Sequence, residues 1–218
     1  VAEDLAGVRF VRSRTWLWGP LASATVAYLL FMGPIEVLLP YLIKEVLHGS
    51  AAEFGIILAA GGVGALAAAA IVGQVGLPRR QQTFMYLCWT LAAVSVAGFG
   101  LATAGWQLMV VSVILNGLEA AGTVAWATTK QRLVPADMLG RVSSLDWFIS
   151  IAGLPVSFAL TAPVAALIGA RATFIAASVL CTSVTLGALF LPHMRGVDGA
   201  LTVTPTPTRE AEAEAAAA

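Results

Sequence analysis

The residues with the clearest potential for chemistry lie three or four positions apart within one long apolar stretch. They are Ser112, Asn116, Glu119, Thr123, Trp126 and Lys130. At about 100° per residue in an α-helix, their side chains fall within an arc of about 80° and form one polar stripe. Ionisable groups in such a setting usually mark a substrate or proton pathway, or a buried pair.

A second, shorter set lies earlier in the chain and shares one helical face. It comprises Thr25, Tyr28, Met32 and Glu36. Two such faces would line an aqueous cavity if their helices met across it. Two alternatives stay open: Asn116 and Glu119 could only hydrogen-bond a neighbouring helix, and Glu36 could reach the interface or pair with Lys44.

The composition indicates that these helices lie in lipid. Of the 218 residues, 59% are hydrophobic and 11% are charged, with a mean hydropathy of +0.87. A soluble domain carries about a quarter charged residues, so this chain could not cover its core with a soluble surface. The net charge of zero argues against a nucleic-acid partner.

The apolar runs predict an all-α membrane protein with six transmembrane helices. A spanning helix needs about 20 mostly apolar residues, and the turn-tolerant Thr103-Ala104-Gly105 divides the longest run in two. The expected spans are 16–43, 52–77, 82–103, 106–129, 143–168 and 171–192. The transmembrane domain therefore occupies 15–194, between an interfacial linker at 1–14 and a disordered cytoplasmic tail at 195–218.

The distribution of lysine and arginine predicts the orientation. The six-span arrangement leaves only Lys44 and Arg171 on one side. The other ten basic residues are Arg9, Arg12, Arg14, Arg79, Arg80, Lys130, Arg132, Arg141, Arg195 and Arg209. Because basic residues favour the inner side, we expect a multi-pass protein of the plasma (inner) membrane with both termini cytoplasmic.

The remaining helices differ in kind. The second expected span is rich in glycine and alanine, and the fifth holds Gly153, Pro155 and Pro163, so both suit close or sliding helix contacts and a bent fifth helix. Static packing of small residues is the alternative. The third span has no charge and the sixth has none beyond Arg171 at its first position, as expected of helices that face lipid.

No motif points to enzymatic chemistry. The sequence has no P-loop, no metal-ligand cluster and no HExxH, and Cys88 and Cys181 lie in apolar runs typical of core residues. We therefore expect no enzyme activity, no cofactor and no metal.

The segment from Arg132 to Leu145, with Val134-Pro135 and Gly140-Arg141 followed by Ser143-Ser144, resembles the major facilitator superfamily. The closest likeness is to multidrug and siderophore exporters of the enterobactin-exporter type. The lead-in Asp4-Leu5 to Arg12 looks like their central linker, so the resemblance makes these spans helices seven to twelve, one half of the fold.

The resemblance implies roles for the helices. Helices seven and ten of such transporters line the cavity, which would give the substrate and proton pathway to Glu119, Asn116, Glu36, Thr123, Tyr28, Met32, Ser112 and Trp126. Cytoplasmic gating would involve Arg79, Arg80, Arg132 and Arg141. The loop at 73–80 departs from the family pattern because it lacks the usual acidic residue, which puts its ion-pair network in doubt.

Three functions remain open from the sequence. The first is the C-terminal half of a proton-coupled exporter that moves an amphipathic small molecule and needs an N-terminal six-helix half. The second is a self-standing six-span transporter made of two copies. The third is a membrane scaffold or inactive remnant that transports nothing.

Overall fold

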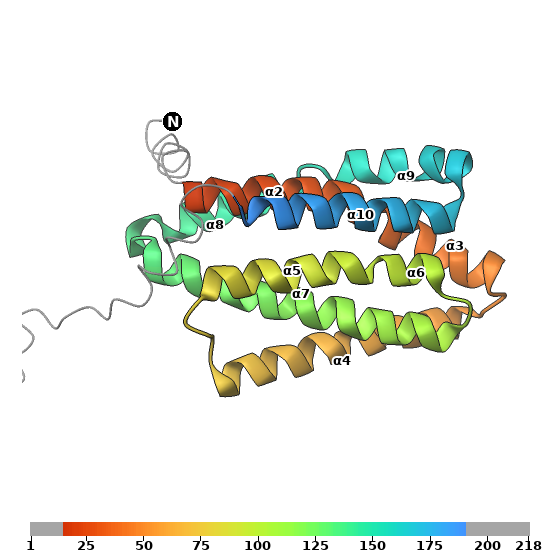
Figure 1. Cartoon of the computed structure of the whole chain (residues 1–218), viewed down its shortest axis with the longest axis horizontal. Coiled ribbons are helices and arrows are strands. Elements are labelled where there is room, and N and C mark those ends of the chain that lie inside the picture. The colour runs from red at the N-terminus through yellow and green to blue at the C-terminus, as the bar shows by residue number, and fades with distance from the viewer. Residues whose placement is uncertain (1–14, 191–218) are drawn as a thin grey trace, which may run out of the picture.

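A computed structural model describes residues 15–190, which form a bundle of long helices with roughly parallel axes (Figure 1). No strand occurs within this described part of the chain. The helices are α2 (Thr15–Gly33), α3 (Leu39–Tyr41), α4 (Ala51–Val75), α5 (Gln81–Ser95), α6 (Ala97–Leu101), α7 (Gly105–Leu133), α8 (Ala136–Ile151), α9 (Leu154–Ile168) and α10 (Ala170–Ala188), with π-helical turns η1 (Pro34–Leu38) and η2 (Leu42–Val46). The expected linker and tail lie outside the described residues.

Six of these helical stretches are long and apolar enough to cross a membrane, which confirms the predicted fold class. They are Leu17–Val46, Ala51–Val75, Gln81–Leu101, Gly105–Leu133, Ala136–Ile168 and Ala170–Ala188. The fifth begins at Ala136, earlier than the expected residue 143. Pro135 precedes the first turn, where no backbone N–H is needed, and Asp137 in that turn suits the positive end of the helix dipole.

Two of the spanning stretches are irregular, and they pack against each other. Pro34 begins the π-helical turn η1, because proline supplies no backbone N–H and disrupts the regular ladder. The expected bend in the fifth span lies at Ala152-Gly153, between α8 and α9, whereas Pro163 lies inside α9 without a break. The backbone N–H of Gly33 donates to Ser157 Oγ at 2.8 Å, which joins the end of α2 to α9.

The packing of the first three spans repeats in the last three. The first span, α2 with η1, packs against α9 and α10, and the fourth span, α7, packs against α4 and α5. Spans one, two and three thus correspond to four, five and six, and the third and sixth, α5 and α10, pack on each other. Two three-helix repeats of this kind build half of many transporter folds.

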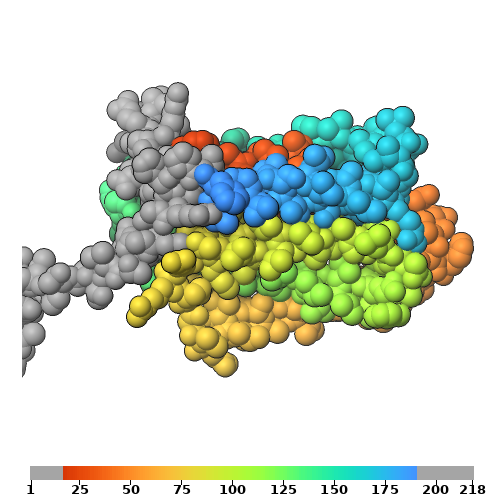
Figure 2. Space-filling view, in the orientation of Figure 1, coloured from red at the N-terminus to blue at the C-terminus, as the bar shows by residue number. Residues whose placement is uncertain are grey.

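The surface of α4 and of the α8–α9 span is the least covered by the rest of the chain. Within their most apolar 18-residue windows, 17% and 11% of residues are buried, against 50% in the α5–α6 span. Figure 2 shows α4 along the outer edge of the bundle. Exposed apolar side chains on these helices include Leu58, Val63, Leu66, Ile71, Phe158 and Leu167. Such faces require lipid or another protein chain to cover them.

The described basic residues divide between the two ends of the bundle. The α4–α5 connection, the end of α7 and the start of α8 meet at one end in Figure 1. They carry Arg79, Arg80, Lys130, Arg132 and Arg141, whereas η2 and the start of α10 bring Lys44 and Arg171 to the opposite end.

Candidate functional site

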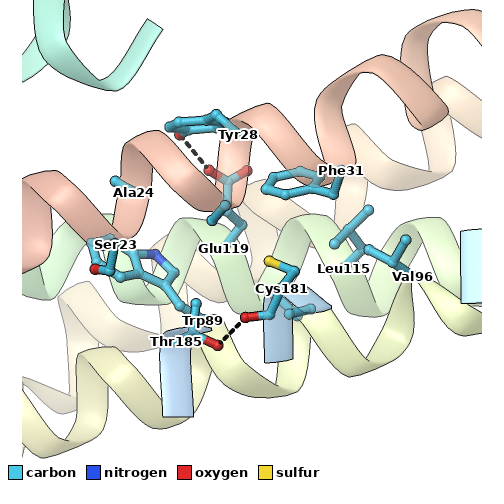
Figure 3. A pocket seen from close by; sticks show the side chains of 13 residues that line it. Ser23, Ala24, Tyr28, Phe31, Trp89, Val96, Leu115, Glu119, Cys181 and Thr185 are labelled. Atoms are coloured by element: carbon cyan, nitrogen blue, oxygen red, sulfur yellow. Dashed lines mark hydrogen bonds between the residues drawn. The ribbon is translucent and has the colours of Figure 1, made fainter. Parts of the chain in front are cut away.

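One hydrogen bond links the two helices that carry the predicted polar faces. The hydroxyl of Tyr28 on α2 donates to Glu119 Oε1 on α7 at 3.2 Å (Figure 3). The two helices otherwise make little direct backbone contact, because each packs on different neighbours. Glu119 is half-buried, and its second oxygen has no donor among the described residues. The structure therefore places an incompletely satisfied carboxylate near the middle of an apolar bundle.

This carboxylate lines a cavity of about 50 Å³ between α2, α5, α7 and α10. Its walls are Ser23, Ala24, Ala27, Tyr28, Phe31, Trp89, Ala92, Ala93, Val96, Leu115, Glu119, Cys181 and Thr185. A site for a drug-sized molecule has a volume on the order of 300 Å³ or more, whereas one water needs about 10–15 Å³ measured in this way. The cavity thus has room for a few waters or one small chemical group.

The other end of the polar stripe contacts α4 instead of this cavity. Asn116 Nδ2 donates to the carbonyl of Ser112 at 2.9 Å. A Cβ added to Gly61 of α4 would lie 2.6 Å from Ser112 Oγ and 2.7 Å from Asn116 Nδ2. Glycine at position 61 therefore lets α4 lie directly on this pair, and both residues take part in helix packing.

The remaining predicted pathway residues lie apart from the cavity wall. Thr123 and Glu36 are exposed, and Met32 is half-buried beyond Tyr28 on α2. The predicted loop arginines, Arg79, Arg80, Arg132 and Arg141, are exposed at one end of the bundle.

Trp126 and Lys130 lie in a second buried cluster around Asp146 of α8. Trp126 Nε1 donates to Asp146 Oδ2 at 2.9 Å, and Lys130 Nζ forms an ion pair with the same oxygen. Lys130 Nζ also lies 5.3 Å from the centroid of the Trp126 ring, within range of a cation–π contact. All three residues are at most 8% exposed.

Sequence reasoning missed Asp146, although a signal was present. An aspartate within an expected span is costly unless it is paired, and Lys130 ends the preceding span. The sequence spacing of Lys130 and Asp146 does not predict their contact, because α8 does not run back along α7 as the second helix of a simple hairpin would. It packs mainly on α2, and the connection brings its first turns across the end of the bundle.

Comparison with known families decides the classification. A family model described as transmembrane secretion effector, of the major facilitator type, matches residues 3–212. The chain belongs to this family. No curated protein and no solved structure matches the chain.

Membership in the transmembrane secretion effector family makes this chain a transporter-type membrane protein and fits the repeated packing of its helices. Halves of major facilitator proteins contain two three-helix repeats in inverted orientation. On that scheme α2 and α7 are equivalent helices of the two repeats, and the Tyr28–Glu119 hydrogen bond joins them. No three His, Cys, Asp or Glu side chains gather closely enough within residues 15–190 to hold a metal ion.

Proposed function

We propose that this chain is the C-terminal six-helix half of a transporter that exports an amphipathic small molecule by alternating access and couples export to proton exchange. The observation that carries the proposal is the Tyr28–Glu119 hydrogen bond between α2 and α7, beside a cavity in an otherwise apolar interior. Glu119 offers a titratable carboxylate that forms no ion pair with a lysine, arginine or histidine among the described residues. The likeness to exporters of the enterobactin-exporter type supports the direction of transport.

The exposed faces of α4 and α9 support an N-terminal six-helix half as the partner. Both helices are apolar and poorly buried, and the glycine and alanine residues of α4 leave a smooth surface. A second copy of this chain is the alternative occupant of these faces. We place the protein in the plasma (inner) membrane. Five of the seven described basic residues lie at the end of the bundle that holds the α4–α5 connection, and basic residues favour the cytoplasmic side. We therefore propose that this end and both termini are cytoplasmic.

The contact between α2 and α7 suits a reversible transition. Hydrogen bonds between membrane helices contribute only about 0.6 kcal/mol on average, so the Tyr28–Glu119 bond can open without a large cost. Opening it would expose Glu119 Oε1 to substrate or water, and closing it would satisfy the carboxylate again. The Tyr28–Glu119 pair can thus open and close as the two halves of the transporter rock against each other.

The test replaces Glu119 in the complete transporter. Glu119→Gln keeps the shape of the side chain and its ability to hydrogen-bond Tyr28, so expression and thermal stability should stay near normal. Efflux should nevertheless fall at least ~10-fold, or its pH dependence should shift, because the charge and the titratable proton are lost. Asp137→Asn, an exposed change in the first turn of α8, is the matched control.

Glu119→Ala separates transport from packing. If the carboxylate only joins helices, the alanine variant loses thermal stability while the glutamine variant exports with a normal pH profile. That combination would contradict the proposed pathway and favour a scaffold or inactive remnant.

A further inference from the structure

We propose that the cavity beside Glu119 binds the ammonium group of a cationic amphipath, whose apolar body lies outside the cavity. The inference rests on the proposed transport function, since it names the substrate class for that same site. Three observations on this cavity carry it: its charge, its aromatic wall and its size.

The charge balance of the bundle interior leaves one negative group without a cation. Away from the end that holds Lys44, Glu53 and Arg171, the acidic and basic side chains among the described residues that are not exposed are Glu119, Lys130 and Asp146. Lys130 and Asp146 neutralise each other in their buried ion pair. Glu119 receives only the neutral hydroxyl of Tyr28. Burying an uncompensated carboxylate is costly, so the site favours a positively charged ligand, or a proton in its absence.

The aromatic wall favours the same ligand. Figure 3 shows the Glu119 carboxylate between the rings of Tyr28 and Phe31, with the Trp89 indole on the opposite wall. The Tyr28 and Phe31 centroids are 5.6 Å apart, so the two rings form one continuous surface. Aromatic faces attract ammonium groups through their quadrupoles, most strongly for tryptophan. A carboxylate beside aromatic rings in one cavity is the chemistry that recognises an amine.

The volume of the cavity admits one chemical group of a ligand and excludes a whole drug-sized molecule. About 50 Å³ holds an ammonium with its first carbons but not an aromatic drug. A neutral or anionic head group would leave the free Glu119 oxygen unpaired or repelled, so the site discriminates by charge.

The test compares three probes with one carbon skeleton on the purified full chain in lipid nanodiscs. They are 4-phenylbutylammonium, 4-phenylbutanol and 4-phenylbutyrate, titrated by calorimetry with empty nanodiscs as the blank. The ammonium probe should bind at least ~10-fold more tightly than the alcohol, and the carboxylate should bind most weakly. Equal affinities for ammonium and alcohol, or no binding of any probe, would overturn the inference.

Three substitutions locate the site. Glu119→Gln should remove the advantage of the ammonium probe and change the alcohol affinity less than ~3-fold. Glu45→Gln, which alters an exposed acid paired with Lys44, should leave all three affinities unchanged. Trp89→Leu should lower the affinity for the ammonium probe several-fold, whereas Trp89→Phe, which keeps a ring, should retain most of the affinity. The two Trp89 variants test the site even if the Glu119 variant fails to fold.

Failure of this inference is distinguishable from failure of the proposed function. Charge-selective binding that depends on Glu119, without efflux from the complete protein, would contradict transport and leave the ammonium site in place. Efflux that depends on Glu119, without any preference for the ammonium probe, would contradict the ammonium site alone.

Discussion

At the residue scale, two acids of the bundle have opposite surroundings. Asp146 is nearly fully buried, pairs with Lys130 and accepts a hydrogen bond from Trp126. Glu119 is half-buried, and its one protein donor is a neutral hydroxyl. The first arrangement is saturated and suits a structural role, whereas the second leaves a site for a ligand or a proton.

Removing one partner of the Lys130–Asp146 ion pair should destabilise the protein strongly, whereas replacing both partners with uncharged residues should destabilise it little. Asp146→Asn or Lys130→Met alone leaves an unpaired buried charge or donor and should cost about 3–5 kcal/mol. The double variant Lys130→Met with Asp146→Asn should recover most of that loss, because no buried charge remains and the amide oxygen at position 146 can still accept the hydrogen bond from Trp126. Thermal unfolding in detergent, followed by tryptophan fluorescence, measures all three.

An exposed pair supplies the control for this cycle. Lys44 and Glu45 lie 3.4 Å apart with side chains 81% and 53% exposed, and such pairs contribute at most about 1 kcal/mol. Removing Glu45 should therefore leave the unfolding temperature nearly unchanged. If the single Asp146 and Lys130 variants behaved like this control, the buried ion pair would not be a stabilising element.

At the element scale, α2 approaches α9 closely at Gly33. A Cβ at Gly33 would lie 2.5 Å from the carbonyl oxygen of Ser157 and 2.6 Å from its Oγ. Because the first of these atoms is backbone, no rotation of a side chain could relieve the contact. The glycine thus allows the irregular end of α2 to rest on α9.

Alanine at position 33 should destabilise the protein by about 1–3 kcal/mol, since overpacking forces the two helices apart. Gly55 on α4 is the matched control, because a Cβ there meets nothing within 4 Å. Gly55→Ala should be neutral or stabilising by up to about 1 kcal/mol, as alanine favours a helix. The unfolding temperatures of both variants in the same detergent test this prediction. Equal unfolding temperatures would contradict the close contact at Gly33.

Periodicity predicts which residues share a helix face but not which helix that face meets. The spacing therefore predicts the polar stripe from Ser112 to Lys130, yet Ser112 and Asn116 lie against Gly61 of α4, and Trp126 binds Asp146. The breaks at Thr103–Gly105 and Gly153 could be predicted, because glycine and turn residues mark them locally. The π-helical turn at Pro34 could not, because it depends on how the backbone rearranges around a proline within a packed helix.

At the scale of the whole molecule, both ends of the bundle are open to chemical labelling. Single cysteines at Ala51 and Thr103 occupy exposed positions at one end, and cysteines at Arg80 and Ala136 occupy exposed positions at the other. In a background without Cys88 and Cys181, an impermeant thiol reagent added to intact cells should label only the first two. Labelling of the cysteine at position 80 would contradict the proposed orientation.

Dependence on a partner half gives the second test at this scale. We expect the chain expressed alone to give no efflux, because one half of the transport pathway is missing, and co-expression with an N-terminal half to restore it. Efflux assays with and without that half measure the difference. Full activity of the purified chain alone, with a crosslinked dimer, would instead support two copies of this chain.

The partners of α7 also have a bearing on how the protein is made. A carboxylate at the centre of a helix opposes insertion by about 2.5–3.5 kcal/mol, so the span with Glu119 carries a cost that its neighbours must offset. Tyr28 and Gly61, which meet the polar residues of α7, belong to α2 and α4 and leave the ribosome first. Lys130 and Trp126 are likewise in place before Asp146 emerges. Chain order thus places the partners of Glu119 and of Asp146 in the bilayer before these two acids emerge.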